Sequence, residues 1–277
     1  RVERFDRDGY FAVGSRELLP QSWRWSAAGV QATEGDIGSL THSLLARVAS
    51  ALEARDGVHM AAMRTAADDR GQNVLFHVDA AVLLLHAAVD VAARVAHRVL
   101  GLSGSERDAS WRGKAWLREL KAAAPGLAEV MGAGTQGGRV FDVLRAFRNT
   151  IHGDALHNAT VIKGREVKRL IALPAAEVNY VLARIDQLGG REVWGVERDS
   201  EASLWISPET FIEQLFSKML PLLNELMEST PVERLAGVNL TPADLRPPPD
   251  SGLLLGAGLM DSRFRTSIRW QLGFSRP

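Results

Sequence analysis

Residues 73–100 read NVLFHVDAAVLLLHAAVDVAARVAHRVL, and this stretch decides the fold class. Placed on a helix, it is apolar on nearly all sides, which is typical of a helix buried at the centre of a protein. The pattern predicts a helix that begins near residue 59 or 72 and ends at Gly101. We expect this helix to pack inside the protein and not to cross a membrane, because its apolar run is interrupted by Asp79, His86, Asp90 and Arg94.

Apolar residues at helical or alternating spacing predict the other elements. Further helices are expected at 37–55 (ended by Gly57), 114–123, 139–156, 174–189 and 207–228, the last kinked at Pro221. A β-hairpin with its turn near Gly164 is expected within 159–173, and short strands at 191–199, 203–206 and in RFRTSIRW, residues 263–270. The sequence therefore predicts a mainly α protein, a helical bundle with an inserted or appended β-hairpin or small antiparallel sheet.

The same pattern divides the chain into five successive parts. We expect an irregular N-terminal arm whose Trp23 and Trp25 pack onto the body, a helical core, a small β-element with one helix, a helix that packs back on the bundle, and a mostly irregular tail. These parts correspond to residues 1–36, 37–157, 158–206, 207–230 and 231–277. The segment GAGTQGG, residues 132–138, is expected to be a flexible connector.

The composition excludes several classes of protein. Basic and acidic residues number 33 each over 277 residues, so the chain is not a strongly cationic nucleic-acid coat. Five of the basic residues are lysines and the other 28 are arginines, which bind phosphate through a planar fork. The chain contains no cysteine, which excludes disulfides and thiol nucleophiles and is compatible with the cytoplasm, the location that we expect.

The predicted helix 139–156, RVFDVLRAFRNTIHGDAL, has one apolar and one polar face. At about 100° per residue, with Arg145 at zero, His152, Arg148 and Asn149 lie at about 340°, 300° and 40°. A histidine can move a proton near neutral pH, and an arginine can hold a phosphate and stabilise charge developing on it. This grouping suits cleavage of RNA by attack of the 2′-hydroxyl on the neighbouring phosphorus, although a solvated helix face would contain the same residue types.

The segment AFRNTIHGDAL resembles the Arg-Asn…His signature of HEPN domains (higher eukaryote and prokaryote nucleotide-binding). The family pattern is an arginine, often followed by a polar residue, and a histidine after four to six intervening residues. Arg148, with Asn149 after it, resembles the motif in residue type, but only three residues separate it from His152. Arg145 matches in spacing, with six residues between it and His152, but Ala146 follows it. The stretch LLLHAAVDVAARV is also similar to the family.

The resemblance implies that the fold is a HEPN-like bundle and that the protein is a metal-independent endoribonuclease. Such an enzyme would cleave RNA as a toxin or as an anti-phage or abortive-infection effector. The resemblance also implies a homodimer and an antitoxin or defence-system protein as a partner. The site residues would be His152 as general acid or base, Arg148 and Arg145 on the phosphate, Asn149 as an orienting group, and Asp90 placing an arginine. The alternative is a non-catalytic HEPN-like module for dimerisation, protein binding or nucleotide binding.

Local charge predicts additional contacts with RNA. Residues 136–169 contain seven basic and three acidic side chains, although the whole chain is neutral. An RNA-binding surface beside the motif helix would use the five residues Arg139, Lys163, Arg165, Lys168 and Arg169. A solvated edge strand with protective charges explains the same hairpin residues. We expect no metal site and no cofactor, because the chain has no Glu-x-x-His pair and no phosphate-binding glycine loop.

Overall fold

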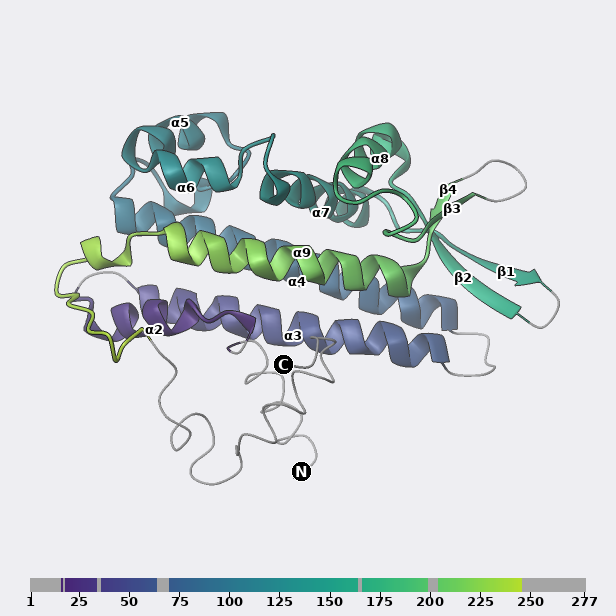
Figure 1. Ribbon diagram of the computed structural model, residues 1–277, viewed down its shortest axis with the longest axis horizontal. Coiled ribbons are helices and arrows are strands. Elements are labelled where there is room, and N and C mark those ends of the chain that lie inside the picture. Colours follow the sequence, from purple (N-terminus) through teal and green to yellow (C-terminus); the bar gives the residue numbers. More distant parts are fainter. Residues whose placement is uncertain are drawn as a thin grey trace, which may run out of the picture. The chain divides into compact units, whose positions relative to one another are not determined.

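The structure is a computed structural model that describes residues 16, 18–33, 36–63, 70–163, 166–198 and 204–245. It confirms the predicted fold class, because the described part is mainly helical and has one small antiparallel sheet (Figure 1). The helices and strands, with η for a 3₁₀ helix, are α2 (Ser22–Gln31), α3 (Ile37–Met63), α4 (Arg70–Leu100), η1 (Glu106–Asp108), α5 (Lys114–Ala123), α6 (Pro125–Val130), α7 (Gln136–Gly153), β1 (Asn158–Lys163), β2 (Glu166–Ala172), η2 (Ala175–Glu177), α8 (Val178–Gln187), β3 (Val196–Arg198), β4 (Leu204–Ile206), α9 (Pro208–Ser229) and η3 (Val232–Arg234).

The chain forms two compact units, each built from separate stretches of sequence. The first unit contains the described residues of Arg1–Ala49, Ala88–Leu127 and Leu223–Pro277. The second contains those of Ser50–Ala87 and Ala128–Leu222. The long helices α3, α4 and α9 contribute to both units.

In the first unit, α2 is fastened to the C-terminal end of α9. The Arg24 guanidinium donates to the carbonyl oxygens of Met227 at 3.0 Å and Thr230 at 3.0 Å, and it forms an ion pair with Glu233. Trp25 is fully buried, and its indole N–H donates to the Met227 carbonyl at 2.9 Å. The arm expected to be irregular therefore contains a helix, because the short α2 obtains its stability from these contacts and not from its own length.

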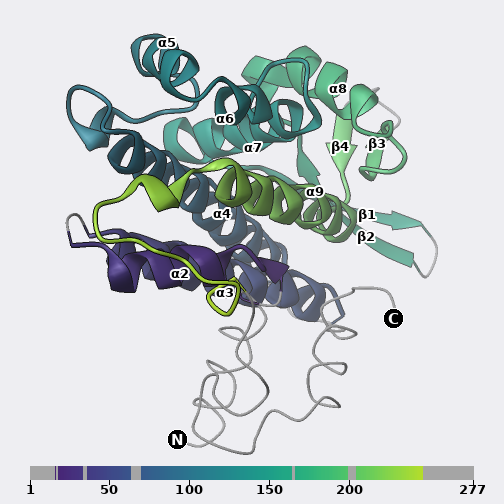
Figure 2. The same cartoon turned by 60° about the vertical axis from the view of Figure 1, so that its left-hand side comes forward.

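The second unit contains α7, α8 and the sheet, whose strand order is β1-β2-β4-β3. Figures 1 and 2 both show α7 and α8 side by side and the β1–β2 hairpin projecting from the helices of this unit. The hairpin register pairs Asn158 with Ile171 and Lys163 with Glu166. Its turn at Gly164 lies outside the described residues, as does the strand expected at 263–270.

Aromatic side chains fill the core of the second unit. Phe147 of α7 stacks on Phe211 of α9 with ring centroids 4.4 Å apart, and Trp194 lies 6.1 Å from Phe211. His86 of α4 stacks on Phe141 of α7 at 5.3 Å. These contacts bury the apolar face of α7 that the sequence predicted, so its polar residues are left on the remaining faces.

Two predictions made from glycines, a helix end at Gly57 and a flexible connector at 132–138, are wrong. Close contacts with neighbouring atoms explain why glycine stands at these positions. Helix α3 does not end at Gly57 but continues to Met63. A Cβ at Gly57 would lie 2.4 Å from the His77 ring, so this glycine lets α4 approach α3 closely. The segment 132–138 is not a loose connector either, because α7 begins within it at Gln136.

By length and composition, Gln72–Leu100 of α4 also passes the test for a helix that crosses a membrane, with a mean hydropathy of 1.8. Half of the most apolar 18-residue segment of this helix is buried inside the protein. The buried core helix of a protein that lies outside membranes can have the same length and composition.

Candidate functional site

The N-terminal turn of α7 is closely packed. The Thr135 hydroxyl caps the helix by accepting from the Gly138 N–H at 3.0 Å, and it lies 2.8 Å from the Gly132 carbonyl oxygen. A Cβ on Gly138 would come within 1.9 Å of that same carbonyl. Only glycine fits at residue 138, so the start of the motif helix is held at a defined position.

One turn further along, α8 holds α7 through a buried carboxylate. Asp142 is 2% exposed, and its Oδ2 accepts from the Tyr180 hydroxyl at 2.6 Å and from Arg184 Nε at 3.2 Å. The Arg184 guanidinium also lies over the Tyr180 ring, 4.7 Å from its centroid. The hydrogen bond to Tyr180, with the charge of Asp142, raises the pKa of Arg184. Buried charge is expected to be paired in this way, since an unpaired carboxylate would be costly.

The four motif residues follow towards the C-terminal end of α7. Arg145 is half-buried, and its Nε has no hydrogen-bond partner among the described residues. Arg148 is half-buried, and its Nη1 donates weakly to Asn149 Oδ1 at 3.4 Å. Asn149 and His152 are exposed. Within the described part of the chain neither Arg148 nor His152 forms an ion pair, so both remain available to a ligand.

The space around the end of α7 is open. A Cβ on Gly153 would meet no atom of another described residue within 4 Å, its chain neighbours and own helix backbone aside. Asn149 lies at the edge of a pocket of about 380 Å³, lined by the last turn of α7, the segment after it, the end of β2 and helix η2. Of the four motif residues, Asn149 lines this pocket, whereas Arg145, Arg148 and His152 are not among its lining residues.

The acidic residues of α4 are divided between the two units. Asp90, expected to place an arginine, is half-buried in the first unit, whereas α7 belongs to the second. Asp79 belongs to the second unit, and its Oδ1 is buried without a hydrogen-bond partner among the described residues. Burial raises the pKa of Asp79. His97 of α4, in the first unit, is buried and accepts from the Trp116 indole N–H at 3.3 Å.

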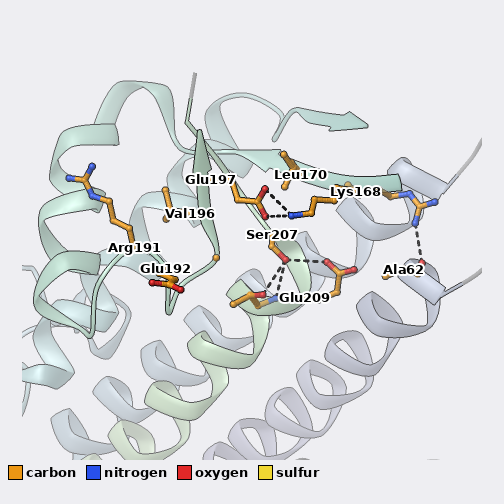
Figure 3. A pocket seen from close by; sticks show the side chains of 12 residues that line it. Ala62, Lys168, Leu170, Arg191, Glu192, Val196, Glu197, Ser207 and Glu209 are labelled. Carbon is orange, nitrogen blue, oxygen red and sulfur yellow. Dashed lines mark hydrogen bonds and ion pairs between the residues drawn. The ribbon is translucent and has the colours of Figure 1, made fainter. Parts of the chain in front are cut away.

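The expected RNA-binding residues do not form one group with the motif. Lys168 and Arg169 line a separate pocket of about 780 Å³, which none of the motif residues lines (Figure 3). There, Lys168 pairs with Glu197 at 3.3 Å, and Arg169 donates to the Ala62 carbonyl at 3.3 Å. Arg139 is half-buried in the first turn of α7, Lys163 ends β1, and Arg165 lies outside the described residues.

A further polar cluster of the second unit was not expected from the sequence. His59 Nε2 of α3 lies 2.8 Å from Glu213 Oε1 of α9, and Arg55 Nε lies 3.6 Å from the same oxygen. Burial would raise the pKa of Glu213, but the hydrogen bond from His59 and the charges of Arg55 and His59 outweigh it and hold the pKa below its usual range. Arg55 and His59 lie one turn apart on α3, but Glu213 follows His59 by 154 residues, so only the packing of α3 against α9 brings the carboxylate to them.

In the described ranges, no three His, Asp or Glu side chains are placed to hold a metal ion together. Comparison with known proteins adds no family, since no family model, curated protein or solved structure matches this chain. The chemistry of the α7 face must therefore be argued from its residues.

Proposed function

We propose that the polar face of α7 binds the phosphodiester backbone of RNA and that the protein is a HEPN-like, metal-independent endoribonuclease. The observation that carries the proposal is the placement of Arg145, Arg148, Asn149 and His152 together at the open end of a helix whose other end is fastened. The accessible imidazole supplies proton transfer, and the two guanidinium groups supply charge.

In this mechanism the 2′-oxygen of a ribose attacks the adjacent phosphorus, and the bond to the 5′-oxygen of the next nucleotide breaks. His152 takes the proton of the 2′-hydroxyl or gives one to the departing 5′-oxygen. The other transfer falls to water or to His152 of a second copy of the chain in the proposed homodimer. Arg148, with Arg145, neutralises the charge on the phosphorane, and Asn149 orients Arg148. The products are a 2′,3′-cyclic phosphate and a 5′-hydroxyl.

We further propose that this activity serves a toxin or an anti-phage defence effector in the cytoplasm, held in check by an antitoxin or other partner protein. The proposal rests on the resemblance of AFRNTIHGDAL to HEPN ribonucleases. Residues that bind and cleave RNA on an accessible face, as proposed here, require such control in a cell.

Incubation of the full chain with RNA in EDTA tests the activity. Wild type is expected to release fragments with 2′,3′-cyclic phosphates, and His152→Ala to slow release by about 10²–10⁴-fold, the usual contribution of a general acid or base. His42→Ala, an exposed histidine of α3, is the matched control and should cleave like wild type. Identical RNA patterns from wild type and His152→Ala would exclude the mechanism.

Arg148→Ala separates the nuclease from a binding module. Loss of cleavage with unchanged oligomeric state supports the catalytic assignment. If wild type does not cleave RNA and Arg148→Ala alters self-association or nucleotide binding, the face serves as a non-catalytic module. Arg118→Ala, an exposed arginine of α5, controls for the general loss of positive charge.

A further inference from the structure

The pocket of about 380 Å³ beside Asn149 has the dimensions of a small-ligand site. One side is formed by the last turn of α7 and the segment that follows, and the other by the end of β2 and helix η2. Leu156 and Leu173, each 5% exposed, and several alanines make most of its wall apolar. A flat apolar ring would fit such a wall.

The polar groups of this pocket are few and differ in chemistry. Glu177 is half-buried and stands at the N-terminal cap position of α8, yet its side chain makes no capping hydrogen bond to that helix. The Asn149 amide provides a donor and an acceptor, and the exposed His157 provides a flat ring. Asp154 accepts from the N–H of Ala155 at 2.8 Å, so one of its oxygens is already used.

The charges assign different parts of a nucleotide to different places. Among the described residues that line the pocket, two are carboxylates and none is a lysine or arginine, so a phosphate is disfavoured there. Arg148 and Arg145 are the cations within about one turn of Asn149 on the same helix. A nucleotide would therefore place its phosphate on the arginines and its base in the pocket.

The carboxylate of Glu177, which makes no capping hydrogen bond to α8, would distinguish the four bases by their hydrogen-bonding edges. A carboxylate only accepts hydrogen bonds, so it favours an edge with two adjacent donors. Guanine has such an edge, the N1–H and the exocyclic amine, whereas adenine and cytosine place an acceptor beside their amine. Uracil has one N–H between two carbonyl oxygens. Sequence-specific RNA-binding proteins read unstacked bases in this way, by stacking and by hydrogen bonds to their edges.

We propose that the pocket beside Asn149 binds the guanine base on the 5′ side of the cleaved bond, with Glu177 as its specificity-determining residue. The inference rests on the proposed ribonuclease function, because it places the base next to the scissile phosphate. Glu177 accepts from the guanine N1–H and amine, Asn149 hydrogen-bonds O6 or N7, and His157 covers the ring.

Binding of the four nucleoside 3′-monophosphates to the full chain, measured by calorimetry, tests the pocket without requiring cleavage. Guanosine 3′-monophosphate is expected to bind about tenfold tighter or more than the other three, since one good bidentate contact discriminates by roughly that factor. Glu177→Gln should lose most of the preference, because its amide replaces one acceptor with a donor. Glu192→Gln, an exposed glutamate elsewhere in this unit, should retain it.

Cleavage of RNA oligonucleotides with a single guanosine, or with inosine in its place, provides the second arm. Cleavage after guanosine that falls about tenfold with inosine, which lacks the exocyclic amine, supports the pocket. Cleavage without base preference, or equal preference in folded Glu177→Gln, overturns the pocket and leaves the proposed function intact. Guanosine-specific binding that depends on Glu177, without cleavage by wild type, overturns the nuclease and leaves the pocket.

Discussion

The two ends of α7 differ in how they are held. At the N-terminal end, Thr135 caps the helix, Gly138 packs against the Gly132 carbonyl, and Asp142 is bound by Tyr180 and Arg184 of α8. At the C-terminal end, Arg148 has one weak hydrogen bond, His152 is exposed, and a Cβ on Gly153 would contact none of the described residues beyond its own turn of helix.

The difference shows how one helix can combine rigidity with free functional groups. A group that reacts must be placed to within a fraction of an ångström, but its own donors must remain unused until the ligand arrives. In α7 the contacts that set position lie about two to five turns before the groups that remain unused. If this division is correct, substitutions at the two ends must have different consequences.

The largest effect is expected from Asp142→Ala. It removes the carboxylate that accepts from the Tyr180 hydroxyl and from Arg184 Nε, and among the described residues Arg184 keeps only its long hydrogen bonds to Gln187 and Tyr180. Breaking a buried ion pair on one side costs about 3 kcal/mol or more in the free energy of unfolding, measured by urea denaturation. Asp186→Ala, which removes the exposed pair between Asp186 and Arg191, should cost less than about 1 kcal/mol. Equal losses from both variants would show that the network does not fasten α7.

A smaller effect on stability is expected from Gly138→Ala, and none from Gly153→Ala at the opposite end of the same helix. The new Cβ at residue 138 would be 1.9 Å from an oxygen, so the free energy of unfolding should fall by about 1–3 kcal/mol. At residue 153 the Cβ enters open space, so stability should not fall. If RNA lies against Gly153, that variant will bind RNA less tightly at unchanged stability. Equal thermal destabilisation by both changes would contradict the difference between the ends.

The smallest effect is expected from Asp79→Asn on α4. Because burial raises the pKa of Asp79 above its value in the unfolded chain, the folded state favours the protonated acid, and stability is lost as pH rises from 3.8 towards the folded pKa. At pH 7 the amide should stabilise the protein, by about 0.5 kcal/mol or less, because water screens the half-buried charge. The gain should disappear below pH 3.8, and a gain independent of pH in denaturation curves would exclude this cause.

Much of the fold could be predicted from periodicity, because α4 and α7 must bury wide apolar faces. The errors occur where packing overrides a local signal. Gly57 is usually read as a helix end, but here it admits the His77 ring, and the glycines before Arg139 fit a crowded first turn. The helix α2 gives only a weak signal of its own, because its stability comes from Met227, Thr230 and Glu233, about 200 residues away.

The site was predictable only within one helix. The grouping of the four motif residues follows from their spacing. Asp142 forms an i, i+3, i+7, i+10 series with Arg145, Asn149 and His152, so the helical wheel alone could have included it. The chain reverses its direction after the hairpin, which brings Tyr180, Arg184 and Glu177 to this helix. Local sequence cannot predict such contacts. Charge counting grouped Lys168 with the motif, but it could not anticipate the partner Glu197.

The contacts between Arg24 and the C-terminal end of α9 constrain when this part of the chain can fold during synthesis. Arg24 is translated before the acceptors that it needs, from Met227 to Glu233, which follow 203–209 residues later. At a ribosomal rate of roughly 5–20 residues per second, on the order of 10–40 s pass before α2 can dock. Until then Trp25 lacks the Met227 carbonyl, and its indole lacks the contact that buries it in the finished protein. This corner of the protein therefore forms only after the chain has been made as far as Glu233, and until then the indole of Trp25 lacks its acceptor.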